Sequence, residues 1–194
     1  MSKSDSASAK KERNKTIRWV VTIFFITMLV TGVISLLSDQ IMSVSGITVA
    51  FLILLFIILL GIMFDIVGVA VTSADEKPFH SMAARKVPGA QDAIKLIRNA
   101  ERVGSICNDV IGDICGVISG SASATIAAQV LQKLDFSWPQ VITLTMSALV
   151  AGMTVGGKAL GKTFAINSST KIVHSAGKII YMLRQFPWMR KKKK

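Results

Sequence analysis

The chain has 194 residues, of which 51% are hydrophobic, and its formal net charge is +12 at pH 7. Composition of this kind does not separate a soluble domain from a membrane protein. The positive charge does not require a nucleic-acid partner, because membrane orientation and anionic lipid headgroups account for it. The sequence shows no nucleophile constellation of Ser, Cys and His and no phosphate-binding glycine loop. We therefore do not expect an enzyme.

The N-terminal part of the chain combines a polar tail with an apolar run. The first sixteen residues are rich in Ser, Lys and Ala, which predicts a disordered basic tail over 1–16. The uncharged run Trp19–Leu37 follows and predicts a first membrane span over 18–38. Read as a signal peptide, this run is too long, and no small-residue cleavage site follows it. We expect the span to be retained.

Three further apolar segments follow. Ile47–Phe64 is uncharged over eighteen residues, long enough for the hydrocarbon core, and predicts a span over 46–73. The segments 104–132 and 139–163 are the other two spans, and 104–132 is rich in Gly, Ser and Ala, which favours the interior of a bundle. The predicted fold is an all-α membrane protein with one transmembrane domain over 17–186 and four transmembrane helices.

Two stretches have amphipathic helical periodicity without the hydropathy of a span. One is a connector over 89–103, and the other is a juxtamembrane helix over 168–186. In the second, the apolar stripe consists of Ile172, Ala176, Ile179, Leu183 and Phe186, opposite Lys171, Lys178 and Arg184. Such helices lie in the headgroup plane. A basic tail over 187–194 would then bind anionic lipid.

Basic residues are strongly one-sided along this topology. The loops 39–45 and 133–138 contain only Lys133, so twenty-two of the twenty-three Lys and Arg residues lie on the other side. The positive-inside rule makes that side cytoplasmic. We expect a multi-pass protein of a bacterial plasma membrane with both termini in the cytoplasm.

Three carboxylates fall within the predicted spans: Asp65, Asp109 and Asp113. Each charge near the bilayer centre costs about 2.5–3.5 kcal/mol on insertion scales, so each needs a cation, a proton, a basic partner or water. The second and third spans contain no Lys or Arg, and Lys158 and Lys162 lie near the cytoplasmic end of the fourth. A bound hard cation, Mg²⁺ first, is the interpretation we favour, because all the candidate ligands are oxygens.

The candidate metal ligands are Asp65, Asp109, Asp113 and Asn108. Asp109 and Asp113 are four residues apart and share one helical face, and Asn108 adds a neutral oxygen. Asp65 lies near Gly68, where glycine permits an open backbone. The alternative is that these aspartates lie near the cytoplasmic interface and are solvated.

Small residues recur at intervals of four in the last two spans. They are Gly112, Gly116, Gly120, Ala124 and Ala128 in one helix and Ala148, Gly152 and Gly156 in the other. Such spacing permits close helix packing, either within one subunit or at the seam of a homodimer. We expect a homodimer.

Three motifs resemble those of the CorB/CorC and cyclin M magnesium transporters. Phe64–Ala74 occupies the place of a helix ending like F-S-G-S-E-T-A-L-x-S-L, and Asn99–Arg102 resembles an N-P-E-R connector end. Gly157–Lys162 resembles G-E-x-x-P-K, followed by a juxtamembrane helix over 167–186. The order and spacing are similar over roughly residues 48–186. The resemblance implies a transmembrane domain that transports or exports magnesium.

The chain departs from the family pattern at several positions. Gly68 replaces the Glu of the first motif, and Lys158 and Gly161 replace the Glu and Pro of the third. The first span is additional, and the family's CBS pair does not follow within these 194 residues, so we expect no nucleotide regulation through it.

The family's G-N-x-x-x-N ligand motif has no intact copy. An ungapped comparison places Ile111 and Cys115 on the two asparagines, whereas a two-residue shift places Asp109 and Asp113 there. We prefer the shift, because Ile and Cys would not bind a hard cation. With Asp65 at the family's first serine, a Ser/Asn/Asn site becomes Asp/Asp/Asp.

Two functions are consistent with these features. The first is transport or efflux of a divalent cation, Mg²⁺ first, through an intramembrane carboxylate site. The second is a non-transporting membrane scaffold or accessory subunit that retains the fold. Ion-dependent thermal stabilisation would distinguish them, because only a protein that binds the ion is stabilised by it.

Overall fold

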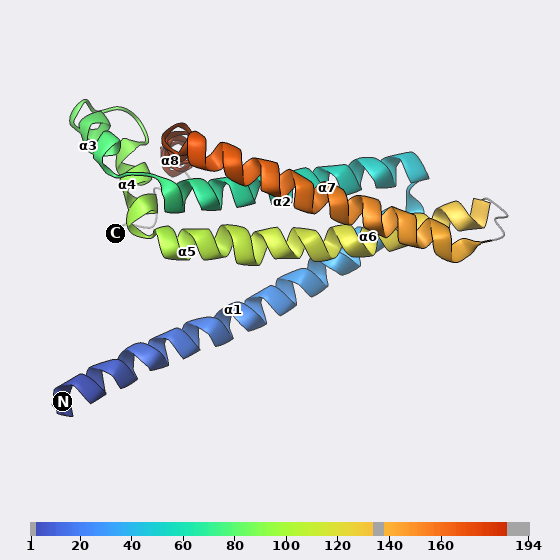
Figure 1. Ribbon diagram of the computed structural model, residues 1–194, viewed down its shortest axis with the longest axis horizontal. Coiled ribbons are helices and arrows are strands. Elements are labelled where there is room, and N and C mark those ends of the chain that lie inside the picture. The colour runs from blue at the N-terminus through green and yellow to red at the C-terminus, as the bar shows by residue number, and fades with distance from the viewer. Residues whose placement is uncertain (1–2, 134–137, 186–194) are drawn as a thin grey trace.

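The computed structural model describes residues 3–133 and 138–185, and this part of the chain folds as a bundle of long helices with a plate of short helices at one end (Figure 1). In chain order the elements are α1 (Lys3–Val44), α2 (Ile47–Ser73), α3 (Lys77–Ala84), α4 (Ala90–Arg98), α5 (Ala100–Ser105), the π-helix η1 (Ile106–Gly112), α6 (Asp113–Lys133), α7 (Pro139–Asn167) and α8 (Ser169–Gln185).

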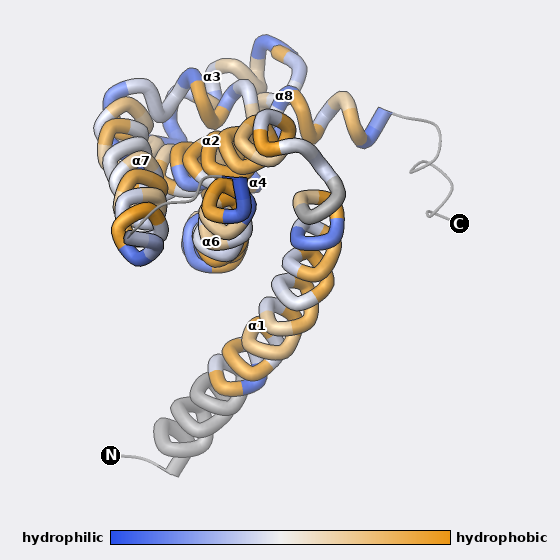
Figure 2. Tube along the Cα trace, turned by 90° about the vertical axis from the view of Figure 1, so that its right-hand side faces the viewer, coloured by the Kyte–Doolittle hydropathy of each residue, from blue (hydrophilic) through white to orange (hydrophobic). Residues whose placement is uncertain are grey.

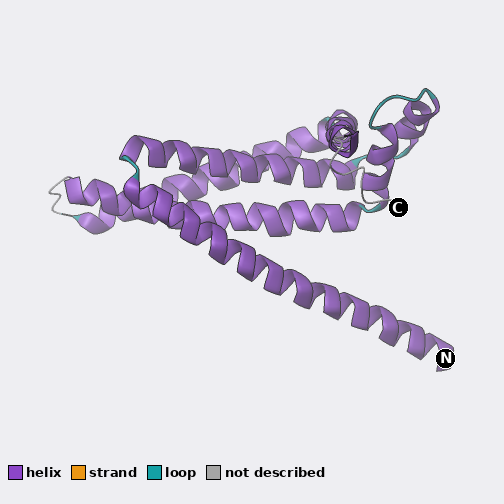
Figure 3. Cartoon of the chain, turned by 180° about the vertical axis from the view of Figure 1, so that it is seen from behind, coloured by secondary structure: helices purple, strands orange, loops and turns teal. Residues whose placement is uncertain are grey.

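Four helical stretches are long and apolar enough to cross a membrane. They are Thr16–Met42 within α1, α2, the continuous stretch Ala100–Lys133 formed by α5, η1 and α6, and α7. Figure 2 shows the apolar residues along these helices, and the described chain contains helices and short connections without strands (Figure 3). The prediction of an all-α membrane protein with four long apolar helices is confirmed.

Helix boundaries differ from the predicted ones at the N-terminus and between α2 and α4. α1 begins at Lys3, inside the range predicted to be a disordered tail. Ala, Lys and Glu are good helix formers, and extending a helix that already exists needs no new nucleus. α3 was not predicted, and it has a proline in its first turn, where the missing N–H needs no partner. Phe186 and the predicted tail over 187–194 lie outside the described residues.

The bundle is formed by α2, α6 and α7. Its apolar core contains Met42, Ala50, Leu54, Ile58, Ala122, Ile126 and Val150. α1 joins this core only through its C-terminal part, where Gln129 Nε2 donates a 2.7 Å hydrogen bond to the Met42 carbonyl. Towards its N-terminus α1 diverges from the other helices, and the apolar side chains there are exposed (Figure 1).

Only some of the glycines in the bundle allow close helix contacts. A Cβ at Gly61 would lie 2.8 Å from Cys115 Cβ, and one at Gly161 would lie 2.8 Å from Ile66 Cγ1, so these positions bring α6 and α7 against α2. The same test at four of the glycines predicted to pack closely finds nothing within 4 Å: Gly116, Gly120, Gly152 and Gly156. These four therefore make no tight contact within the subunit.

The short helices pack against the end of the bundle where α2 ends. α8 runs across this end, nearly perpendicular to the bundle (Figure 1), and the second core there contains Ala70, Val71, Phe79, Ala93, Ala165 and Val173. Gly89 has φ +84°, a backbone conformation that favours glycine. A Cβ at Gly177 would lie 2.6 Å from the carbonyl oxygen of Gly89, so glycine at both positions lets α8 approach the turn before α4. The predicted stripe of α8 is beside this contact, with Ile179 and Leu183 more than half exposed.

Candidate functional site

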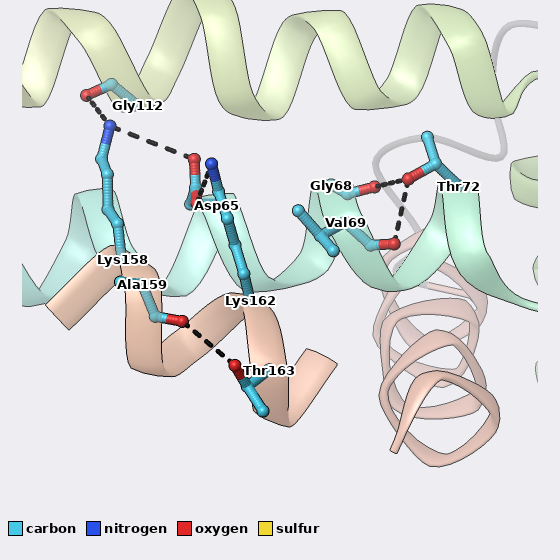
Figure 4. A network of polar contacts seen from close by, with 9 residues as sticks. All are labelled: Asp65, Gly68, Val69, Thr72, Gly112, Lys158, Ala159, Lys162 and Thr163. Atoms are coloured by element: carbon cyan, nitrogen blue, oxygen red, sulfur yellow. Dashed lines mark hydrogen bonds and ion pairs between the residues drawn. The ribbon is translucent and has the colours of Figure 1, made fainter. Parts of the chain in front are cut away.

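Asp65 is a buried carboxylate in the bundle. It lies in the C-terminal part of α2 and is only 4% exposed. Two lysines from α7 approach it: Lys158 Nζ lies 4.0 Å from Oδ1, and Lys162 Nζ lies 4.0 Å from Oδ2 (Figure 4). The lysines are four residues apart and therefore project from the same face of α7. We call Asp65, Lys158 and Lys162 the Asp65 cluster.

Lys158 connects three elements. Besides its approach to Asp65 on α2, its Nζ donates a 3.3 Å hydrogen bond to the Gly112 carbonyl at the end of η1 (Figure 4). Its side chain is 20% exposed, whereas that of Lys162 is 55% exposed. Lys158 is thus the inner cation of the cluster, and Lys162 is at its open edge.

Two buried oxygens beside the cluster accept no hydrogen bond. They are Asp65 Oδ2 and Asn108 Oδ1. Asn108 packs directly on Gly68, where a Cβ would collide with its Oδ1. Gly68 follows Asp65 by one turn of α2, so both oxygens lie at the interface of α2 with η1. Buried acceptors without donors are uncommon, and a water or an ion can satisfy them.

The three carboxylates predicted to share one ion do not converge. Asp65 is buried, whereas Asp109 on η1 and Asp113 at the start of α6 are exposed. The described residues contain no group of three or more His, Cys, Asp or Glu side chains that could hold a metal ion. Of the four predicted ligands, the structure brings Asp65 and Asn108 to one interface and leaves Asp109 and Asp113 outside it.

The physical reason is the phase of the helix. The residues that face α2 are Gly104, Asn108, Gly112 and Cys115, as their contacts with Thr72, Gly68, Asp65 and Gly61 show. Asp109 and Asp113 follow Asn108 and Gly112 by one residue, and one residue of a helix turns the side chain by about a quarter of a turn. Cys115, which the ungapped comparison selects, is on the buried side. The solvated alternative for Asp109 and Asp113 fits their exposure.

Lys158 and Lys162 lie beside Asp65, where the sequence interpretation did not place them. They are the basic residues of the fourth predicted span, but their depth beside α2 was not apparent from hydropathy. The signal available was their spacing of four on an apolar helix. The cluster has a formal charge of +1, so the two lysines more than offset the charge of Asp65.

The η1 segment has a conformation that is unusual for a membrane span. Seven residues, Ile106–Gly112, form a π-helix between α5 and α6. π-helical turns occur frequently at functional sites, because they change the register of the backbone carbonyls and side chains. Here η1 supplies both Asn108 Oδ1 and the Gly112 carbonyl to the interface with α2.

No family model, characterised protein or solved structure matches this chain. The resemblance to the magnesium transporters thus stays an expectation drawn from three motifs. What the fold establishes is a multi-span helical protein with candidate transmembrane helices.

Proposed function

We propose that the chain transports a divalent cation, Mg²⁺ first, across the cell membrane by way of the Asp65 cluster. The observation that supports this most is the pair of buried oxygens without hydrogen-bond donors, Asp65 Oδ2 and Asn108 Oδ1, on facing helices. Both are hard ligands, which Mg²⁺ and Ca²⁺ prefer. The Gly112 carbonyl, which accepts a hydrogen bond from the same Lys158 Nζ that approaches Asp65, is a third oxygen at this interface.

A site of this composition suits a partly hydrated ion. Mg²⁺ dehydrates reluctantly, keeps several waters and is usually held by only one or two carboxylates. One carboxylate, one amide oxygen and one carbonyl therefore form a sufficient partial shell. Asp109 and Asp113 are exposed on the same segment. In this proposal they do not coordinate the ion.

The resemblance to the magnesium transporters also supports this proposal, since Asp65 occupies the place of a family ligand. A homodimer is part of the proposal. Gly116, Gly120, Gly152 and Gly156 have open space around them and would form the seam.

A second candidate function is the non-transporting scaffold. The observation that favours it is the position of Lys158 and Lys162, which offset the charge of Asp65 without any ion. In that case the Asp65 cluster would tie α7 to α2 and η1 as a structural contact.

Calorimetric titration of Mg²⁺, Ca²⁺ and Mn²⁺ into the purified protein tests the proposal. Asp65→Asn keeps the shape and one oxygen but removes the charge, and we expect it to weaken binding at least about tenfold. Asp113→Asn is the matched control, because Asp113 is exposed. It should change the affinity by less than about threefold, within ~0.7 kcal/mol. A wild-type protein that binds none of these ions, with Asp65→Asn less stable than wild type, would favour the scaffold.

Transport itself is measured in proteoliposomes that enclose a magnesium-sensitive dye. Wild-type protein should produce a flux that Asp65→Asn reduces and Asp113→Asn preserves. A flux equal in wild-type and Asp65→Asn vesicles would place the ion path elsewhere.

A further inference from the structure

We propose that the Lys158 ammonium occupies the cation position of the Asp65 cluster, so that the structure is a self-inhibited state. A divalent cation would bind only when Lys158 moves away. This inference rests on the proposed function and adds regulation to that site.

The surroundings of Lys158 Nζ resemble those of a bound cation. Its neighbours are oxygens from two different helices, the Gly112 carbonyl at 3.3 Å and Asp65 Oδ1 at 4.0 Å. Gly112 leaves this space open, since a Cβ there would lie 3.3 Å from Nζ and 3.7 Å from Oδ1. The ammonium therefore faces two of the three oxygens that a metal ion would use.

The ammonium and a metal ion cannot share these oxygens. Ca²⁺ and Mg²⁺ bind oxygen ligands at about 2.0–2.6 Å, which would place the ion directly beside the ammonium. Two positive charges at that separation repel each other, and the repulsion is stronger in this partly buried site than in bulk water. Binding of the metal ion therefore requires displacement of Lys158.

The present contacts are loose enough to be displaced. A closed charge-assisted N–H···O bond is about 2.7–2.9 Å long, shorter than either contact of Lys158. Asp65 Oδ2 accepts no hydrogen bond at all. A lysine is a compact charge on a flexible four-carbon stem, so it can leave without movement of α7.

Lys162 provides a matched comparison on the same helix. Its Nζ lies at the same distance from Asp65, but its side chain is 55% exposed. Among the described residues, the hydrogen bond to a backbone oxygen of η1 comes from Lys158 and not from Lys162. Solvent screens its charge. Its removal should affect ion binding much less than removal of Lys158.

The first test is titration of Mg²⁺ and Mn²⁺ into wild-type protein, Lys158→Met and Lys162→Met. We expect Lys158→Met to bind at least about tenfold more tightly than wild type, or ~1.4 kcal/mol. Lys162→Met should change the affinity by less than about threefold. If the wild type binds an ion and Lys158→Met binds it no more tightly, the inference is wrong while the proposed function stands. If both proteins fail to bind any ion, the proposed function fails and the inference with it.

A second test uses wild-type protein and does not depend on the folding of a variant. Reaction of lysine amines with an acylating reagent is followed by mass spectrometry without ion and with saturating Mg²⁺. Displacement predicts that Lys158 becomes several times more reactive, while the exposed Lys171 of α8 stays constant. An unchanged Lys158 under conditions where calorimetry shows bound Mg²⁺ would overturn the inference.

Discussion

Asp92 shows how a single carboxylate stabilises the end of the bundle. It is buried in α4 and receives Lys95 Nζ at 3.0 Å and Arg184 Nη1 from α8 at 2.8 Å. Burial alone would raise the pKa of Asp92, but hydrogen bonds and charge from Lys95 and Arg184 hold it below its ordinary value of 3.8. Arg184 thereby ties α8 to α4.

The lowered pKa of Asp92 predicts a loss of stability in acid. The contribution is complete above pH 3.8, the ordinary pKa, and is lost as the pH falls through the lower value of the folded state. Asp92→Asn should cost about 1.5–3 kcal/mol at neutral pH, as for other hydrogen bonds to charged groups. Thermal unfolding in detergent at pH 7 and pH 3 measures both effects. The difference between wild type and Asp92→Asn should shrink at pH 3, and Glu101→Gln, at an exposed position, should behave as wild type.

Gly68 is a second position where a single added carbon atom should change the packing. A Cβ there would collide with Asn108 Oδ1, so Gly68→Ala must displace the Asn108 side chain or separate α2 from η1. We expect a loss of about 1–3 kcal/mol, typical of overpacking, together with weaker ion binding. Gly32→Ala on α1 is the control, because nothing lies within 4 Å of that position. Equal melting temperatures for the two variants would show that Asn108 is free to move.

At the scale of elements, α8 separates two surfaces. Val173 and Gly177 face the protein, while Ile179, Met182 and Leu183 are 59%, 55% and 51% exposed beside the exposed Lys178. An apolar stripe bordered by basic residues is typical of a helix lying in the headgroup region. The exposed stripe therefore fits contact with lipid.

Ile179→Asp and Leu183→Asp should release α8 from the inner leaflet, because each introduces a charge into the stripe. The core at Val173 is not touched, so the bundle should remain folded. Limited proteolysis in nanodiscs of anionic lipid measures the release as faster cleavage within α8. Gln185→Glu adds a charge near the end of the helix, away from Ile179 and Leu183, and should leave cleavage slow. Cleavage at the wild-type rate in both Asp variants would show that the stripe does not contact lipid.

At the scale of the whole molecule, the distribution of basic residues predicts the orientation. The turn between α1 and α2 would be outside and the plate of α3, α4 and α8 inside. Ser45→Cys should react with an impermeant thiol reagent added to intact cells, and Ser81→Cys, exposed on α3, should react only after permeabilisation. The reverse pattern would invert the topology. Ser43 and residue 137, in the loops predicted to be outside, have no described side chains.

The open glycines predict the oligomeric state. Gly120→Leu and Gly156→Leu should dissociate the expected homodimer, because each fills a surface meant for close helix approach. The monomer should keep its stability, since no atom lies within 4 Å of either position. Native mass spectrometry from detergent measures the ratio of dimer to monomer. Gly32→Leu on α1, also in open space, is the control, and a dimer that persists in both variants would exclude this seam.

Hydropathy and periodicity along the chain were sufficient to locate the four candidate spans and the juxtamembrane helix within a few residues, although α1 itself begins well before its span. The reason is that backbone N–H and C=O groups inside a bilayer must be hydrogen-bonded within the protein, which a helix achieves within one segment of chain. A long uncharged run is also recognisable from the local sequence alone. The same local reading placed Asp65 within a span, where it is buried, and named Asn108, which packs on Gly68 of the same helix. It also grouped Asp109 and Asp113 with them, although both are exposed. Spacing of four shows that two residues share a face, but it does not show which face meets α2.

That choice depends on the tertiary packing. Glycines at 61, 68, 112 and 161 let the helices approach, and the phase of η1 then brings Asn108 and Gly112 to α2 and turns Asp109 and Asp113 outward. The depth of Lys158 and Lys162 was decided in the same way, by the contact of α7 with α2. Their partners are far apart in the chain, Gly112 being 46 residues from Lys158. The sequence shows which charged residues lie in or near the spans, but only the packing of the helices determines which of these residues come into contact.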